Sequence, residues 1–199
     1  AYDELGRLNW KTHVGVDEKV TTDIYGVSVQ ETNYDEFSRE SRYADYLMGD
    51  HKIADIVDEE DALDVEQLQR HLIPSINVFG YHSKVVEFDR SGRELCEIFF
   101  NSTNQESAIK RGYSRRKLKR NEFGYEVQES FYGPDSAAVV DLDTLVHSSK
   151  KELDTYGRVT VERFFNSNDE PTLNKNGIHA IRSTYDARGN EIEVKYFNR

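Results

Sequence analysis

One short pattern recurs along this chain of 199 residues and limits what the chain can fold into. Each copy centres on a glycine, or once a serine, with Asp or Asn three residues earlier. The centres are Gly6, Ser38, Gly92, Gly124, Gly157 and Gly189. Successive centres are separated by 32, 54, 32, 33 and 32 residues, and 54 equals one period of 32 plus an insertion of 22. A fixed period of this length is typical of repeat proteins, whose units pack on their neighbours.

Other positions keep the same step. The acidic or amide residues before the centres are Asp3, Asp35, Asp89, Asn121, Asp154 and Asp186. Seven and eight residues after four of the centres come the aromatic pairs Phe99-Phe100, Phe131-Tyr132, Phe164-Phe165 and Tyr196-Phe197. A second glycine precedes four of the centres by twelve residues, at Gly26, Gly80, Gly112 and Gly177. This agreement predicts six copies of one structural unit, turning near residues 6, 38, 92, 124, 157 and 189.

Within each unit the spacing predicts a β-hairpin. About eight residues lead to the acidic residue, a short turn follows, and about eight more end at the aromatic pair. Glycine reaches the positive φ that such a turn requires, and a short acidic side chain can accept hydrogen bonds from the turn amides. We therefore expect Asp3, Gly6, Asp35, Asp89, Gly92, Gly124, Asp154, Gly157, Asp186 and Gly189 to be structural turn residues. The fold class is all-β: one array over 1–199, in which tandem hairpins form an extended or curled antiparallel sheet.

The insertion falls in the second unit, over residues 48–79. Within it, Ile56, Leu63 and Leu72 belong to an apolar set at near-helical spacing, acidic residues crowd the first turns, and Pro74 follows. This pattern predicts one amphipathic helix over about 58–73 that packs on the sheet or caps an edge. A helix that docks a partner is the alternative.

The stretches YDELGRL, FDRSGRE and YDARGNE resemble the YD repeat of the RHS family of bacterial surface and toxin-associated proteins, with a longer period. They also resemble the YD-and-aromatic repeats of bacterial secreted proteins. The resemblance implies hairpins joined into extended sheets or shells, an architectural, adhesive or encapsulating role, and an exported, extracellular or cell-surface setting. It implies no catalytic residue.

Charge and composition restrict the class of partner. The net charge is −11, which disfavours nucleic acid as a partner because nucleic-acid-binding surfaces are basic. A basic run over 110–120 is the local exception, either an anion-binding patch or a solvated strand face paired with acidic neighbours. The apolar fraction of 37% is low for a compact globule, yet 12 Tyr and 10 Phe argue against disorder. No apolar run is long enough for a transmembrane helix, and the N-terminal residues do not resemble a signal peptide.

No catalytic or metal-binding signature is found in the sequence. The six histidines show no zinc spacing, and Cys96 is the single cysteine, so we expect no metal, no cofactor and no disulfide. His82 and His179 share one repeat position, which indicates a structural role. The oxygen-rich stretch 166–170 lacks a calcium-loop pattern. A hydrolase with a site in the insertion, around His51, Asp58 and His71, is the remaining enzymatic alternative.

The sequence thus predicts a non-enzymatic structural or adhesive repeat module. The chain begins and ends within a repeat, so its strand edges are expected to associate with another copy or to continue into further repeats. A module that binds glycan or protein is the alternative. Its candidate surface is the aromatic ladder of Phe99, Phe100, Phe131, Tyr132, Phe164, Phe165, Tyr196 and Phe197, although these rings are equally suited to core packing.

Overall fold

Antiparallel hairpins build the whole of the described chain in the computed structural model, which describes residues 1–12, 27, 29–48 and 72–198. The strands are β1 (Trp10–Thr12), β2 (Val29–Tyr34), β3 (Glu40–Met48), β4 (Leu72–Pro74), β5 (Ser83–Phe88), β6 (Glu94–Phe100), β7 (Arg115–Arg120), β8 (Glu126–Tyr132), β9 (Ser148–Leu153), β10 (Val159–Phe165), β11 (Ala180–Tyr185) and β12 (Glu191–Phe197). They form one sheet in chain order, except that β4 pairs with β3 beside the main path. The prediction of an all-β array of tandem hairpins is confirmed.

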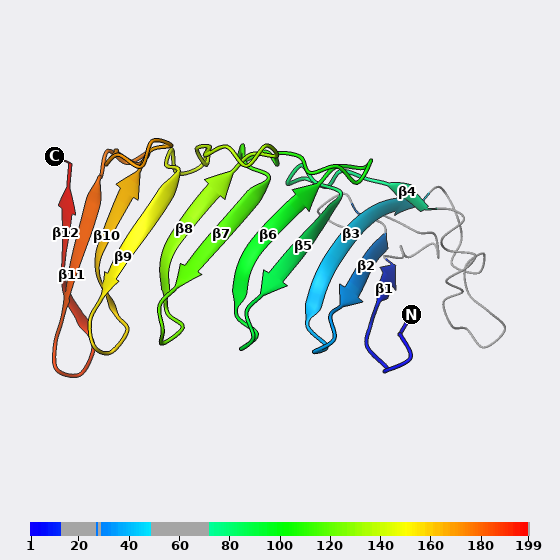
Figure 1. Cartoon of the computed structure of the whole chain (residues 1–199), viewed down its shortest axis with the longest axis horizontal. Helices are drawn as coiled ribbons and strands as arrows, with labels where there is room; N and C mark the ends of the chain where they lie inside the picture. Colours follow the sequence, from blue (N-terminus) through cyan, green and yellow to red (C-terminus); the bar gives the residue numbers. More distant parts are fainter. Residues whose placement is uncertain (13–26, 28, 49–71, 199) are drawn as a thin grey trace, which may run out of the picture. The chain divides into compact units, whose positions relative to one another are not determined.

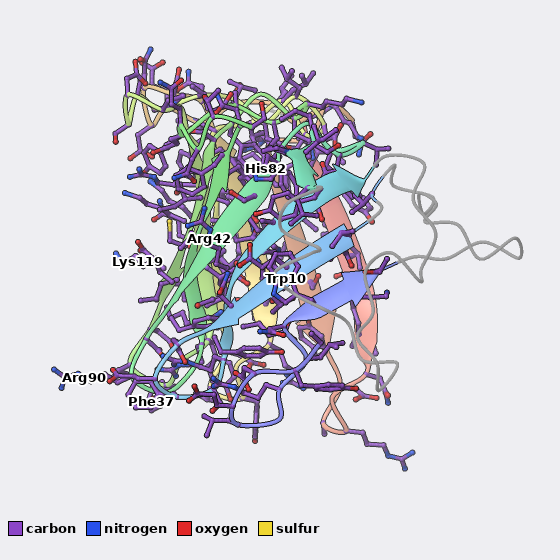
Figure 2. The ribbon with its side chains drawn as sticks, turned by 90° about the vertical axis from the view of Figure 1, so that its right-hand side faces the viewer. Trp10, Phe37, Arg42, His82, Arg90 and Lys119 are labelled. Carbon is purple, nitrogen blue, oxygen red and sulfur yellow. The ribbon has the colours of Figure 1, made fainter. Side chains whose placement is uncertain are left out.

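By its contacts the chain divides into two compact units. The N-terminal unit comprises Ala1–Val86 and Ile98–Ser107, and the C-terminal unit comprises Glu87–Glu97 and Ala108–Arg199. In each unit the hairpin turns lie at one end of the strands and the connections between hairpins lie at the other (Figure 1). Within the N-terminal unit, Phe37 marks the turn end and His82 the connection end (Figure 2).

The hairpin turns have the geometry that the repeat predicts. In the turn after β9, the amide of Gly157 donates to the carbonyl of Asp154 at 3.0 Å, and the amide of Asp154 donates to the carbonyl of Arg158 at 2.9 Å. Gly157 has a φ of +81°, and the strand register shifts between Val159 and Val161. A tight turn followed by a left-handed residue and a bulge is a common hairpin connection whose twist suits the strands.

The connections over 101–113, 133–146 and 166–178 each contain two more turns of the same kind. Asn166 opens one and Asn174 the next, and each side-chain oxygen accepts two turn amides. The fourth residue of each turn is left-handed, at φ +61° for Asp169 and +73° for Gly177. The same device therefore recurs three times in this repeat. The turn from Asn174 contains the recurring upstream glycine, Gly177, whereas the turn from Asn166 has Asp169 in its place and carries no glycine signal.

The one repeat of 33 residues has its extra residue in a connection turn. The turn from Asp141 closes on Val146, at 2.9 Å from the Asp141 amide to the Val146 carbonyl, whereas the equivalent turn from Asn174 closes on Ile178. Leu145 takes the left-handed position at φ +62°. The turn from Asp141 is therefore one residue longer than the equivalent turn from Asn174.

The predicted helix over 58–73 lies outside the described residues except at its end. Leu72 and Ile73 belong to β4, which pairs with β3 through Met48 and Leu47, so this end is strand and not helix. The assignment fails there because apolar spacing alone does not separate a short strand from the last turn of a helix.

The core of the C-terminal unit lies between one face of the sheet and the connections. Phe131, Phe164 and Val146 are buried there, and the rings of Tyr113 and Phe131 lie 4.7 Å apart. We call the face that carries Phe131 and Phe164 the covered face, and the opposite one, which carries Tyr132 and Phe165, the open face. In the N-terminal unit Trp10, Val27 and Val29 are buried, and the Trp10 ring lies 6.0 Å from that of Tyr46.

The turn glycines differ in what surrounds them, which gives a test of the fold. A Cβ at Gly157 would lie 2.3 Å from Cζ of Tyr125, whereas a Cβ at Gly177 would meet nothing within 4 Å. Gly177→Ala should cost about 1–2 kcal/mol for its left-handed backbone alone. Gly157→Ala should cost more because the Tyr125 ring must also move. Urea unfolding of both variants checks the order, and equal losses would contradict this packing.

Candidate functional site

The turn aspartates organise the most regular polar contacts of the molecule. In the first turn, Asp3 Oδ1 accepts the backbone amides of Leu5 and Arg7 at 3.0 and 2.9 Å, and Oδ2 accepts Nε of Arg7 at 2.6 Å. The same set of contacts recurs at Asp35, Asp89 and Asp154. At Asn121 and Asp186 the two amide bonds persist without the arginine. All ten predicted turn residues therefore lie in hairpin turns.

The arginine after the turn also reaches the next repeat. Arg7 donates to Oγ of Ser38 at 3.0 Å, and its guanidinium lies 4.6 Å from the centre of the Tyr34 ring. In the C-terminal unit Arg158 lies at the same 4.6 Å over Tyr185. A cation over an aromatic face is attractive, at about 0.5–1 kcal/mol where it is exposed.

A side chain just before each of three turns donates to the repeat behind it. The hydroxyl of Tyr34 donates to the carbonyl of Leu8 at 2.6 Å, and that of Tyr185 to the carbonyl of Val159 at 2.9 Å. Each acceptor lies two residues after the preceding turn centre. We call this contact the latch.

Arg120 makes the latch with a different side chain. It stands where other repeats have tyrosine, and its Nε donates to the carbonyl of Glu94 at 3.1 Å, again two residues after the turn centre at Gly92. An apparent exception to the sequence motif therefore preserves the contact. These contacts explain why the residue pairs Tyr-Asp and Gly-Arg recur. The tyrosine makes the latch to the previous repeat, the aspartate shapes the turn, and the arginine connects that aspartate to the tyrosine of the next repeat.

Hydrogen bonds hold the turn carboxylates in their charged form. The pKa of Asp3 is lowered chiefly by the hydrogen bond from the Arg7 side chain, and that of Asp89 by the backbone amide of Arg93. At Asp154 partial desolvation raises the pKa but is outweighed by the hydrogen bonds from Arg158. The pKa values of Asp35 and Asp186 are lowered as well.

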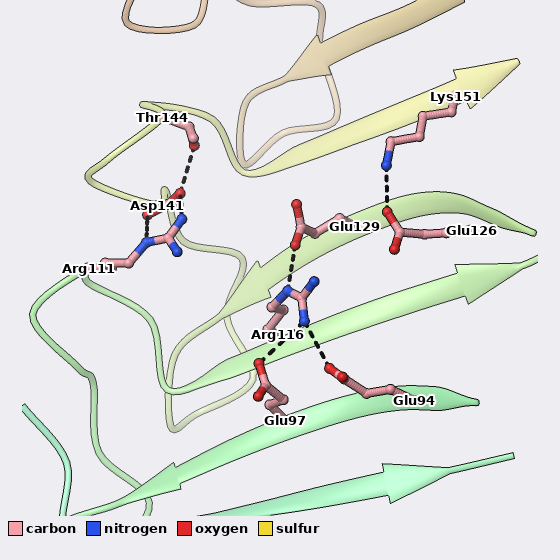
Figure 3. Close-up of polar contacts among 9 residues, drawn as sticks. All are labelled: Glu94, Glu97, Arg111, Arg116, Glu126, Glu129, Asp141, Thr144 and Lys151. Carbon is pink, nitrogen blue, oxygen red and sulfur yellow. Dashed lines mark hydrogen bonds and ion pairs between the residues drawn. The ribbon is translucent and has the colours of Figure 1, made fainter. Parts of the chain in front are cut away.

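Two arginines of the basic run over 110–120, Arg111 and Arg116, are paired with carboxylates (Figure 3). Arg116 binds three glutamates on the covered face, with Nε 2.5 Å from Glu129 and Nη1 2.8 Å from Glu94 and 3.3 Å from Glu97. Burial acts to lower the pKa of Arg116, but Glu129, Glu97 and Glu94 together outweigh it and the pKa is raised. At Arg116 the basic run therefore forms a strand face paired with acidic neighbours, which is one of the two interpretations that the sequence allowed.

Arg111 belongs to the connection above. It forms a two-pronged contact with the buried Asp141, at 2.9 Å to Oδ1 and 2.5 Å to Oδ2, and Thr144 donates to Oδ2 at 2.8 Å. Burial alone would raise the pKa of Asp141, but these bonds lower it, and the pKa of Arg111 is raised in turn by Asp141. The pair fixes two successive connections to each other.

The aromatic pairs have members on both faces. The first members Phe99, Phe131 and Phe164 are buried, while Tyr196 on β12 is exposed. Three second members, on the open face, each lie under a cation from the neighbouring strand. These contacts are Lys117 over Tyr132 at 4.9 Å, Lys150 over Phe165 at 4.2 Å and Arg182 over Phe197 at 5.7 Å. Core packing therefore accounts for three of the eight residues of the predicted ladder.

The histidines occupy a repeat position of their own. Nδ1 of His82 lies 3.1 Å from the carbonyl of Ser75, and Nδ1 of His179 lies 3.0 Å from that of Phe197. His147 is a third member, 3.0 Å from the carbonyl of Val139. Sequence reading missed it because Leu145 replaces the upstream glycine, yet His147 lies ten residues before Gly157, as His82 and His179 do before their own turns.

Other chemistry is scarce in the described part of the chain. His51, Asp58 and His71, proposed for a hydrolase, lie outside the described residues. Among residues 1–12, 27, 29–48 and 72–198, no group of three or more His, Cys, Asp or Glu is placed to hold a metal ion. The same residues contain no helix long and apolar enough to span a membrane.

Comparison with known proteins gives a coarse result. No protein-family profile and no curated protein matches the chain. Among the solved structures similar to it are a crystal structure of TcdB2-TccC3-TEV and the Tc holotoxin pore of Photorhabdus luminescens with a mutation in TccC3. Each is 14% identical with a TM-score of 0.34, and the match covers 85% of this chain and 8% of the other. The chain thus spans a small fraction of the structures it matches.

The latch predicts a measurable loss on removal of one hydroxyl. Tyr185→Phe should lower the free energy of unfolding by about 1 kcal/mol, since one hydrogen bond to a main-chain carbonyl is lost. Tyr156→Phe is the matched control, because Tyr156 lies exposed at a turn tip. Urea unfolding compares the two, and an unchanged stability in Tyr185→Phe would contradict a contribution from the latch.

The turn carboxylates predict a loss of stability in acid. Because their pKa values are lowered in the folded chain, their contribution is present above the unfolded pKa of about 4 and is lost as the pH falls through the folded values. Asp154→Asn should weaken this pH dependence, since Asn121 shows that an amide can still accept the turn N–H groups. Thermal unfolding from pH 6 to about 2 tests both statements. A midpoint independent of pH would exclude the carboxylate contribution.

Proposed function

We propose that the chain is a non-enzymatic structural repeat module that extends its sheet at β12, by pairing with a second copy or with further repeats. On the resemblance of its YD motifs we assign it to an exported bacterial protein with an extracellular or cell-surface, architectural or adhesive role. Itself, or more of the same repeat, is the expected partner.

The exposure of Tyr196 carries the proposal. Its repeat equivalents Phe99, Phe131 and Phe164 are 5%, 3% and 9% exposed, whereas Tyr196 is 63% exposed. In the earlier repeats the connection that follows covers the ring, as when the amide of Thr172 donates to the carbonyl of Phe164 at 2.9 Å. A ring in this position is thus built to be covered by another repeat.

The backbone of β12 supports the same conclusion. Among the described strands β12 pairs with β11 alone, and Ile192 is also exposed on it. An unpaired edge with apolar side chains is a template for strand addition. A strand of this same repeat fits that edge, because the described strands β5 to β12 already pair in this order, each with a strand of its own or the adjacent repeat.

Light scattering on a sizing column over a wide range of concentration tests the proposal. We expect the mass to rise with concentration, and Tyr196→Lys to hold the chain at the monomer mass because a charge would be buried. Phe123→Lys is the control, since Phe123 is 75% exposed at a turn tip away from this edge. A monomer at every concentration would refute assembly through β12. Equal loss of assembly in both variants would assign it to another surface.

A further inference from the structure

One repeat position in the connections is filled by a ring in two repeats and by an aliphatic side chain in three. Eleven residues before the turn centres stand Val27, Tyr81, Tyr113, Val146 and Ile178. The Tyr81 ring lies 5.0 Å from that of Phe99, and the Tyr113 ring lies 4.7 Å from that of Phe131. In the hairpin of β9 and β10 the residue at this position is Val146, which has no ring.

A cavity of about 220 Å³ lies at this place. Its apolar lining is Val146, Phe131 and Phe164, and the lengthened turn contributes Thr144. A cavity of about 150 Å³ is large enough for benzene. The space here therefore admits one six-membered ring with small substituents.

The walls of the cavity are polar. Glu129, Ser149 and Phe164 are paired across β8, β9 and β10 in one row of the covered face, and Glu162 lies two residues before Phe164. Asn174, Lys175 and Asn176, from the connection turn, complete the lining.

Several of these polar groups lack a partner within the part of the chain that the structure describes. No hydrogen bond or ion pair engages the carboxylate of Glu162, the ammonium of Lys175 or the side-chain amide of Asn176 there. They supply both acceptors and donors beside an aromatic floor. Pockets of mixed lining with a few polar groups of this kind are typical of small-molecule sites.

The charges around the cavity balance. Glu129 is paired with Arg116, and the acid of Glu162 is matched by Lys175 in the same lining. A ligand with a net charge therefore gains little from the site. A neutral ring that carries several hydroxyls uses the donors, the acceptors and the phenylalanine floor together.

We propose that this cavity binds one pyranose ring of a neutral sugar. Hydroxyls of the ring donate to Glu162 and accept from Lys175 and Asn176, and its C–H face rests on Phe164. The site occupies the connection side of one hairpin, so it is independent of assembly at β12.

Saturation-transfer NMR and calorimetry with methyl glucopyranoside, methyl mannopyranoside and methyl galactopyranoside test the proposal. We expect at least one to bind the full chain. Val146→Tyr introduces the ring that Tyr81 and Tyr113 supply in two other repeats, and should weaken binding at least about tenfold without loss of thermal stability. Ile178→Tyr, the same change in the next repeat, is the matched control and should bind as the wild type does.

Glu162→Val tests the hydrogen bond between Glu162 and the sugar separately from the size of the cavity. Val194 holds this position in the last repeat, so the strand accepts the side chain, and affinity should fall about tenfold. Binding that survives Val146→Tyr, or preference for cyclohexylamine or cyclohexanecarboxylate over every pyranoside, would overturn the proposal. So would the absence of binding by all three sugars to the wild-type chain.

Discussion

The turn carboxylate is the contact on which the regularity of this molecule depends. One oxygen binds two backbone amides and so fixes the path of the turn, while the other positions a guanidinium. Once the guanidinium is fixed at Arg158, it lies over Tyr185 of the next repeat, whose hydroxyl returns to the carbonyl of Val159. A local turn preference is thereby converted into contact between repeats, which is what an array needs because no single hairpin is stable alone.

The two faces of the sheet carry different parts of the sequence. On the covered face Phe131 and Phe164 pack under the connections and Arg116 gathers three glutamates. On the open face Lys150 stands directly opposite Arg163, and Arg182 opposite Lys195, although like charges across a strand pair are unfavourable. Asp169 pairs with Lys150, Glu152 with Arg163, and Glu193 with Lys195, so neighbouring carboxylates offset part of this repulsion.

The sequence was sufficient to predict the features that depend on the spacing and type of neighbouring residues. The hairpins, the ten turn residues and the packing of Phe99, Phe131 and Phe164 follow from spacing and residue type. It was insufficient at positions where a different type of side chain makes the same contact or opens the same turn. Arg120 replaces a tyrosine, Asn166 opens a turn that has Asp169 where other turns have glycine, and Leu145 displaces the glycine that would have identified His147. The cavity beside Val146 could not be foreseen, since it depends on a small residue and a lengthened turn meeting on one face.

The latches are not uniform, and this has a mechanical consequence. Leu153 occupies the latch position between the turns at Gly124 and Gly157 and has no donor to offer. The same junction is instead spanned by the ion pair of Lys151 with Glu126 at 2.5 Å (Figure 3). Dissolved ions screen a pair of charges far more than they weaken a hydrogen bond to a carbonyl. Rising ionic strength therefore weakens this junction more than the two beside it, where Arg120 and Tyr185 donate to main-chain carbonyls.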